Sequence, residues 1–117
     1  MKKLLKMIPV FLDLQMTPEA KVKKKAVAQL KAMDAYHFYP MTYGYGRSGV
    51  PDIVACYCGK FFGIECKSGS NKPTALQEKN LEDINKAGGF AMVVNEENVD
   101  SLMREMKAMV ELTHPIR

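Results

Sequence analysis

The sequence predicts a mixed α/β domain in which helices flank one β-sheet. Two apolar runs joined by Cys58-Gly59 indicate a β-hairpin, and a helical segment separates this hairpin from a further buried strand over 90–94. A helix between two strands indicates a mixed sheet with helices on both faces. At 117 residues, the chain is long enough for one hydrophobic core and too short for two. We expect the element order α-β-β-β-α-β-α.

The first helix is expected to begin at Pro18 and to run to about Ala35. Thr17 is suited to the N-cap, Pro18 to the first helical position and Glu19 to the first turn. Four apolar residues recur at helical spacing and form the predicted buried stripe: Val22, Ala26, Leu30 and Met33. The lysines of this helix cover its remaining surface.

The predicted strands follow this helix. A short strand over 37–41 leads into a glycine-rich loop, 43–49, that is too permissive for regular structure. Two strands, over 53–57 and 60–67, then form the hairpin. Pro51 is compatible with this arrangement because it falls at the start of a strand.

The second half of the chain predicts a helix, a strand and a helix. The first of these helices spans 73–86, is capped imperfectly by Asn71 or Lys72 and ends at a pair of glycines. The buried strand over 90–94 follows. The last helix ends at Pro115, and its residues form a continuous apolar face: Val99, Leu102, Met103, Met106 and Val110.

The composition is that of a soluble globular protein with a modest positive charge. The net charge of +4 and the isoelectric point near 9.0 are compatible with a polyanionic partner. An odd number of cysteines, Cys56, Cys58 and Cys66, without disulfide-framework spacing favours a reducing cytoplasm. We expect buried free thiols; a zinc site completed by His37 or His114 is the alternative.

An apolar arm, residues 1–16, precedes the predicted core, residues 17–112. It begins with basic and then apolar residues, as a secretory signal does, but Lys6, Pro9 and Asp13 interrupt the apolar run. We therefore expect a soluble cytoplasmic protein without a membrane segment. The arm either packs on the domain or contacts a second copy.

Two carboxylates and a lysine are expected to meet on the hairpin. Glu65 and Lys67 project from the same face of their strand, Cys66 turns to the other face, and Asp52 begins the partner strand. Converging carboxylates repel each other unless a cation lies between them, and Mg²⁺ or Mn²⁺ suits oxygen ligands. Singly, Asp52 is typical of a turn, and Glu65 with Lys67 is typical of a solvated strand edge. Together they indicate a metal site.

This pattern resembles the PD-(D/E)XK nuclease superfamily and, within it, the VRR-NUC (virus-type replication-repair nuclease) branch. The resemblance rests on four elements in this order: Gly49-Val50-Pro51-Asp52, Ile64-Glu65-Cys66-Lys67, Gln77 and the strand that follows Gly88-Gly89. It extends over about residues 17–103. It implies the restriction-endonuclease-like fold, a central mixed sheet flanked by helices.

The resemblance also implies roles for the site residues. Asp52 and Glu65 would hold the metal ion together with the backbone carbonyl of Cys66. Lys67 would orient or deprotonate the attacking water, although neutralisation of a phosphate is equally compatible. Gln77 would hydrogen-bond near the metal or the nucleophile, with its amide directed toward the sheet; an ordinary boundary polar residue is the alternative.

Four further residues are weaker candidates. By resemblance, Glu19 reaches the metal through a water molecule; stabilisation of its helix N-terminus by about 0.3–1 kcal/mol is the alternative. Arg47, Ser48 and Lys72 flank the site residues in the sequence and are candidate DNA contacts. Plain solvation of the surface is the alternative for these three.

The sequence thus predicts a Mg²⁺- or Mn²⁺-dependent deoxyribonuclease that hydrolyses phosphodiester bonds, with Asp52, Glu65, Lys67 and Gln77 as its core. The small size and the resemblance indicate a homodimer acting on branched DNA, such as a Holliday junction or flap, in replication, repair or recombination. They also suggest a phage or prophage source. The rivals are a non-cleaving nucleic-acid-binding module of a larger assembly, and an interaction protein that uses the arm and the Met-rich last helix.

Overall fold

The structure, a computed structural model, describes residues 16–113. In chain order the elements are α2 (Pro18–Ala32), β1 (Tyr36–Phe38), β2 (Ile53–Tyr57), β3 (Lys60–Cys66), α3 (Ala75–Lys86), β4 (Phe90–Val94), the 3₁₀ helix η1 (Val99–Ser101) and α4 (Leu102–Thr113). The predicted order and fold class are confirmed. Most of the predicted arm, together with His114 and Pro115, lies outside the described residues. No helix within residues 16–113 is long and apolar enough to cross a membrane.

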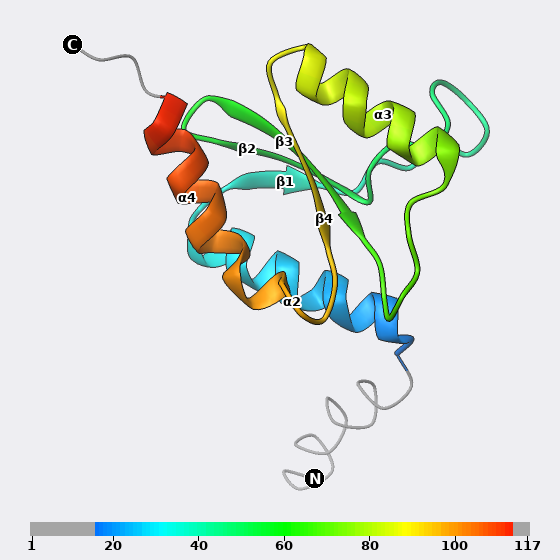
Figure 1. The fold of residues 1–117 in the computed structure, drawn as a ribbon, viewed down its shortest axis with the longest axis horizontal. Coiled ribbons are helices and arrows are strands. Elements are labelled where there is room, and N and C mark those ends of the chain that lie inside the picture. Colours follow the sequence, from blue (N-terminus) through cyan, green and yellow to red (C-terminus); the bar gives the residue numbers. More distant parts are fainter. Residues whose placement is uncertain (1–15, 114–117) are drawn as a thin grey trace, which may run out of the picture.

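The strands of this part of the chain form one mixed sheet in the order β1-β2-β3-β4. The pairs β1–β2 and β2–β3 are antiparallel, and β3–β4 is parallel. Cys58 and Gly59 both have positive φ, 50° and 76°, which gives the tight turn whose twist matches a hairpin. The parallel pair needs a long crossover, and α3 supplies it. In Figure 1, α3 lies on one side of the sheet, with α2 and α4 on the other.

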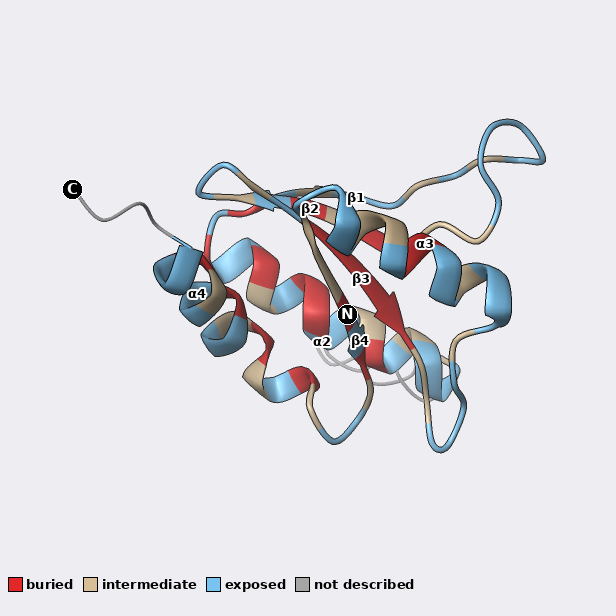
Figure 2. Cartoon of the chain, turned by 45° about the horizontal axis from the view of Figure 1, so that its top comes forward, coloured by how far each residue is buried: buried red, intermediate tan, exposed pale blue. Residues whose placement is uncertain are grey.

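The hydrophobic core lies between the sheet and the pair α2 and α4. Phe62 and Ile64 of β3 are fully buried there, and the stripe on α2 is buried as predicted. Figure 2 shows buried segments, in red, on both β3 and α2. Gln29 fastens α2 to the last helical segment: its side-chain oxygen accepts a hydrogen bond from Met103 N at 2.9 Å, and its amide nitrogen donates to the Val99 carbonyl.

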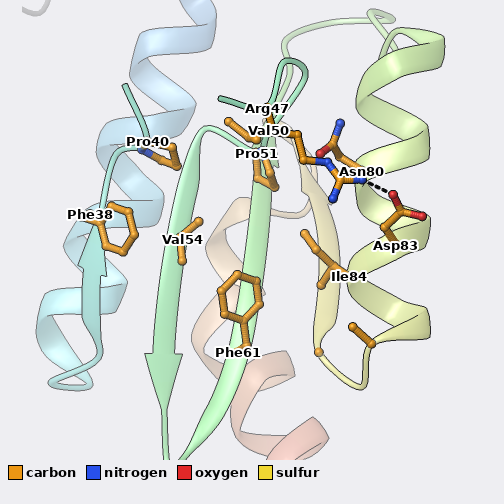
Figure 3. A pocket seen from close by; sticks show the side chains of 12 residues that line it. Phe38, Pro40, Arg47, Val50, Pro51, Val54, Phe61, Asn80, Asp83 and Ile84 are labelled. Carbon is orange, nitrogen blue, oxygen red and sulfur yellow. Dashed lines mark hydrogen bonds and ion pairs between the residues drawn. The ribbon is translucent and has the colours of Figure 1, made fainter. Parts of the chain in front are cut away.

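The other face of the sheet contacts α3 at a glycine. A Cβ on Gly63 would lie 2.5 Å from Ile84 Cδ1 and 3.0 Å from Pro51 Cγ, so glycine permits the close approach of helix, loop and strand. Beside this contact, an open apolar cavity of about 550 Å³ lies between α3 and the strands (Figure 3). Its walls include the half-exposed rings of Phe38 and Phe61.

Four predicted boundaries are wrong. Helix α3 begins at Ala75 rather than at 73, after its N-cap Thr74, and β3 ends at Cys66 rather than at 67. Helix α2 ends at Ala32 rather than near Ala35, because Asp34 adopts a left-handed conformation with φ of 55° and turns the chain into the sheet. The first strand covers Tyr36–Phe38 rather than 37–41, because the chain leaves the partner strand after three paired residues. The last helix begins as η1 and continues as α4, with its predicted apolar face turned to the core.

Candidate active site

Asp52 and Glu65 come together where β2 begins and β3 ends. Ile53 pairs with Ile64 across the two antiparallel strands, so Asp52, one residue earlier, comes opposite Glu65. Asp52 Oδ2 accepts a hydrogen bond from the backbone N–H of Cys66 at 2.8 Å. The strand pairing and this bond therefore bring both carboxylates to the same end of the hairpin.

Glu65 is a buried carboxyl group that lacks a complete set of partners. Its exposed fraction is 1%, and its Oε2 atom has no hydrogen-bond partner. The pKa of Glu65 is raised to about 8, first by burial and then, to a smaller extent, by a hydrogen bond with Asp52 and by the charge of Asp52. The positive charge of Lys67 lowers this pKa, but by less. A polar atom buried without a partner is costly. In its charged form, this carboxylate requires a nearby cation.

Lys67 brings one positive charge to the pair. Its Nζ atom lies 3.9 Å from Glu65 Oε1, and 13% of its side chain is exposed. Its backbone N–H donates to the Val94 carbonyl at 2.9 Å, which extends the pairing of β3 with β4 beyond the end of the strand. Lys67 is therefore fixed by the sheet and turned toward the carboxylates, as the alternation of strand residues predicts.

The cysteines differ from one another in their surroundings. Cys66 is fully buried, and burial, followed by the charges of Asp52 and Glu65, raises the pKa of its thiol to about 12. Cys56 and Cys58 are free thiols as expected, but they are exposed, so the prediction of burial is wrong for these two. By strand alternation, Cys56 lies on the face of β2 opposite the buried Ile53 and Ala55, and its cross-strand neighbours Tyr36 and Phe61 are exposed as well.

The donor atoms at the carboxylate pair suit a hard divalent cation. In the part of the chain that the structure describes, no three His, Cys, Asp or Glu side chains form a metal-binding group. By the family resemblance, an ion here would be held by Asp52, Glu65 and the Cys66 carbonyl, with water completing its shell. Mg²⁺ is commonly bound in this way, through one or two carboxylates and several waters. The unpartnered oxygen of Glu65 fits such an ion.

Gln77 has a structural role at the start of α3. Its side-chain oxygen accepts a hydrogen bond from Thr74 N at 2.9 Å, and Thr74 Oγ1 accepts from Gln77 N at 3.2 Å. This capping box makes Thr74 the N-cap, so the prediction of Asn71 or Lys72 is wrong. The amide of Gln77 is engaged with the cap rather than directed at the sheet, and a role beside the metal stays a prediction.

Glu19 lies within electrostatic range of the carboxylate pair. It lies in the first turn of α2, and its charge is the smallest of the influences that raise the pKa of Glu65. Contact between Glu19 and a metal ion through water stays a prediction. The alternative, that Glu19 stabilises the N-terminus of its helix, also stays a prediction.

The three candidate DNA contacts lie on exposed loops. Arg47 forms an ion pair with Asp83 of α3, so its charge is shared with a carboxylate (Figure 3). The Ser48 carbonyl accepts a hydrogen bond from Asn80 at 3.0 Å. Lys72 is exposed between β3 and α3. Whether these residues contact DNA stays a prediction.

Asn80 was not identified from the sequence. It is 4% exposed, and its amide nitrogen donates to Ser48 O and to Leu76 O. The available signal was a polar residue beside Leu81, within the apolar face that α3 turns to the sheet. Its partner Ser48 is 32 residues away in the sequence, so the pairing could not be read from local pattern.

Two solved structures have a similar fold. One, described as "VRR_NUC domain", has a TM-score of 0.60 and 22% sequence identity, covering 85% of this chain and 100% of that chain. The other, described as "VRR_NUC domain protein", has a TM-score of 0.63 and 19% identity, covering 82% of this chain and 90% of that chain. No protein-family model and no curated protein matches the sequence.

These similarities define the class of fold to which the chain belongs. It is a mixed α/β fold, with one four-stranded sheet between helices. More particularly, the chain has the fold of VRR_NUC domains. The resemblance predicted from the Pro51-Asp52 and Glu65-Cys66-Lys67 motifs is thereby confirmed at the level of the fold. What the site does is a separate question, because fold alone does not establish activity.

Proposed function

We propose that the protein is a VRR-NUC-type nuclease that hydrolyses DNA phosphodiester bonds with Mg²⁺ or Mn²⁺. The observation that carries this proposal is the buried Glu65 carboxyl group, which has an unpartnered oxygen and lies beside Asp52. Two converging carboxylates beside a polyanion would weaken binding unless a cation joined them. The fold similarity to VRR_NUC domains supports the same assignment.

We assign each site residue a role in this reaction. Asp52, Glu65 and the Cys66 carbonyl would hold the ion, which when bound acidifies water and stabilises charge on the phosphate. The Cys66 N–H fixes the Asp52 carboxylate, and burial shields Glu65 from bulk water. The Lys67 ammonium, beside Glu65, would hold the attacking water or a phosphate oxygen. Glu65 must lose its proton before it can serve as a ligand.

The proposed substrate is branched DNA, and the proposed assembly is a homodimer. A chain of 117 residues has little surface with which to grasp a four-way junction alone. A net charge of +4 suits a polyanionic partner. Sedimentation tests the dimer, and a monomer that cuts linear duplex as readily as junctions would contradict this part of the proposal.

The deciding experiment measures cleavage of labelled linear, flapped and four-way-junction DNAs with Mg²⁺ or Mn²⁺. Asp52→Asn nearly preserves shape but removes a charge from the ion site, and we expect it to lower cleavage by more than the roughly 10- to 100-fold typical of residues that only orient a metal ligand. Asp100→Asn is the matched control, because Asp100 is an exposed carboxylate paired with Lys25 at 3.8 Å. We expect it to leave cleavage unchanged.

The result separates the proposed nuclease from its rivals. Wild type that binds DNA but cuts none of the three substrates would support a non-cleaving nucleic-acid-binding module. Wild type that neither binds nor cuts would support a protein-interaction role. Full activity in Asp52→Asn would contradict the proposed ligand set even if wild type cleaves.

A further inference from the structure

Asn80 ties helix α3 to the segment that leads into the candidate metal site. Its buried amide nitrogen donates to the Ser48 carbonyl at 3.0 Å and to Leu76 O, one turn earlier on its own helix, at 2.9 Å. Figure 3 shows Asn80 of α3 at the same end of the cavity as Val50 and Pro51. The segment that it holds, residues 48–52, ends at Asp52.

We propose that Asn80 is a positioning residue, which sets the place of Asp52 through the Ser48 carbonyl and so prepares the metal site. This inference rests on the proposed function, because it gives Asn80 a part in metal binding and cleavage. Asn80 does not itself touch the carboxylates; it acts through the backbone of residues 48–52.

The first half of the segment is pressed against α3. Gly49 has φ of 75°, a left-handed conformation that favours glycine. A Cβ at Gly49 would lie 2.7 Å from Leu76 Cγ and 3.0 Å from Asn80 Nδ2. The backbone therefore reaches Asn80 only because position 49 has no side chain. The hydrogen bond to Ser48 and this close packing fix one end of the segment.

The second half of the segment is fixed by the sheet. Pro51 packs over Gly63 of β3, and Asp52 Oδ2 accepts the hydrogen bond from Cys66 N at 2.8 Å. Proline restricts its own φ and the conformation of the residue before it. A segment this short, with a proline in it, has little freedom to absorb a shift at Ser48. A displacement there is therefore transmitted to the Asp52 carboxylate.

A second side-chain tie on α3 provides a matched control. Asn85 is also an asparagine of α3 whose side chain bonds a backbone group: its Oδ1 atom accepts from Ala91 N at 3.0 Å. That bond ties α3 to β4, which carries neither candidate carboxylate. Asn85→Ala thus removes the same kind of helix-to-backbone contact as Asn80→Ala without touching residues 48–52.

The test compares full-length wild type, Asn80→Ala and Asn85→Ala in three measurements. Calorimetry with Mn²⁺ alone gives metal affinity without DNA, hydrogen exchange gives protection of the amides in 48–52, and steady-state cleavage separates kcat from KM. For Asn80→Ala we expect Mn²⁺ affinity and kcat to fall by roughly 10- to 100-fold, as for residues that orient a metal ligand. We also expect faster exchange in 48–52 and a KM for DNA that changes little. Asn85→Ala should give wild-type values in all three measurements.

The inference and the proposed function fail in different ways. If Asn80→Ala and Asn85→Ala have the same Mn²⁺ affinity and the same hydrogen exchange at 48–52, the inference is wrong, whatever the cleavage result. Wild type that binds Mn²⁺ but cuts no DNA overturns the proposed function, while exchange and Mn²⁺ affinity still decide the role of Asn80. If Asn80→Ala does not fold, Asn80→Ser, which keeps a hydroxyl donor on a shorter side chain, takes its place with the same expected direction.

Discussion

Lys67 and Glu65 project from the same face of the hairpin, with Lys67 Nζ 3.9 Å from Glu65 Oε1. The attraction between them lowers the pKa of Glu65, but burial and the neighbouring Asp52 outweigh it, so the pKa remains at about 8. One lysine therefore does not compensate two converging carboxylates. This imbalance makes the metal-free protein sensitive to pH at the position where a cation would bind.

The first prediction concerns the stability of the metal-free protein. The pKa of Glu65 is about 8 in the folded state against 4.5 for an ordinary glutamate. Between these values the folded state keeps a proton that the unfolded state loses, so the contribution of Glu65 to stability falls as pH rises and is fully lost above about 8. We expect Glu65→Gln to gain stability over wild type by up to about 1.4 kcal/mol per pH unit across this window. Urea unfolding in a chelator, from pH 5 to 8, measures it.

A distant carboxylate and added metal provide the controls. Glu111→Gln changes an exposed glutamate of α4 and should follow the wild-type pH dependence. Adding Mn²⁺ at pH 8 should stabilise wild type but not Glu65→Gln, because a bound ligand stabilises the folded state by mass action. Parallel pH curves for wild type and Glu65→Gln would contradict the prediction.

The hairpin that carries the site could be predicted because its signals are local. Strand alternation places Glu65 and Lys67 on one face, and the Cys58-Gly59 turn sets the register that brings Asp52 opposite Glu65. Thr74-x-x-Gln77 is also a local signal, a capping box, but the prediction for Gln77 used its position on the helix and the family resemblance instead. Local cap chemistry explains the position of its amide in the structure.

The remaining features depend on contacts between distant segments. Cys56 is exposed because its face of the sheet is uncovered at this end, where its neighbours Tyr36 and Phe61 are also exposed, and Tyr36 pairs with it from beyond a long loop. The Asn80 bond to Ser48 joins residues 32 positions apart. The Arg47 ion pair with Asp83 likewise joins a glycine-rich loop to a helix. Periodicity and turn chemistry do not report on such pairings.

The second prediction concerns Lys67. Replacing it with methionine removes the charge that lowers the pKa of Glu65, so the carboxyl group holds its proton to higher pH. We expect Lys67→Met to move the pH profile of cleavage upward, and a pKa of Glu65 higher by one would lower cleavage at pH 7 about tenfold. The measurement is cleavage at fixed Mg²⁺ from pH 6 to 9.

Two further lysine variants test this interpretation. Lys60→Met changes the first residue of β3, at the far end of the same strand, and should keep the wild-type profile. Lys67→Arg keeps a positive charge and should keep most of the wild-type profile if the charge is what matters. An unchanged profile in Lys67→Met would show that Lys67 does not tune Glu65.

The third prediction concerns the ion pair between Arg47 and Asp83. Asp83 also accepts a hydrogen bond from Lys79 at 3.3 Å. Desolvation raises the pKa of Asp83, but Lys79 and Arg47 outweigh it and hold this pKa below its usual range. If Arg47 contacts DNA, Arg47→Gln should weaken binding and reduce the slope of log affinity against log salt by about 1. Asp83→Asn should strengthen binding, because it releases the guanidinium for a phosphate. Fluorescence anisotropy over a range of salt concentrations measures both.

A double-variant comparison separates this effect from a general change in charge. Removing any carboxylate favours a polyanion, so Glu82→Gln, an exposed neighbour on α3, gives the background gain. The gain from Asp83→Asn should exceed that background and should shrink in a protein that also carries Arg47→Gln. Equal gains with and without Arg47 would mean that the arginine does not reach DNA.

The last prediction compares two glycines of the same loop that have nearly the same conformation. Gly46 and Gly49 have φ of 74° and 75°, but a Cβ on Gly46 would meet nothing within 4 Å, whereas one on Gly49 would press on Leu76 and Asn80. Alanine at either position bears the cost of a left-handed backbone, about 1–2 kcal/mol. Gly49→Ala should lose a further 1–3 kcal/mol, roughly, from overpacking.

Urea unfolding of both variants isolates the difference. Gly49→Ala should also weaken Mn²⁺ binding, because it moves the backbone that leads to Asp52. Equal losses of stability would mean that the loop yields at Gly49, and the close packing against α3 would then not hold Asp52 in place.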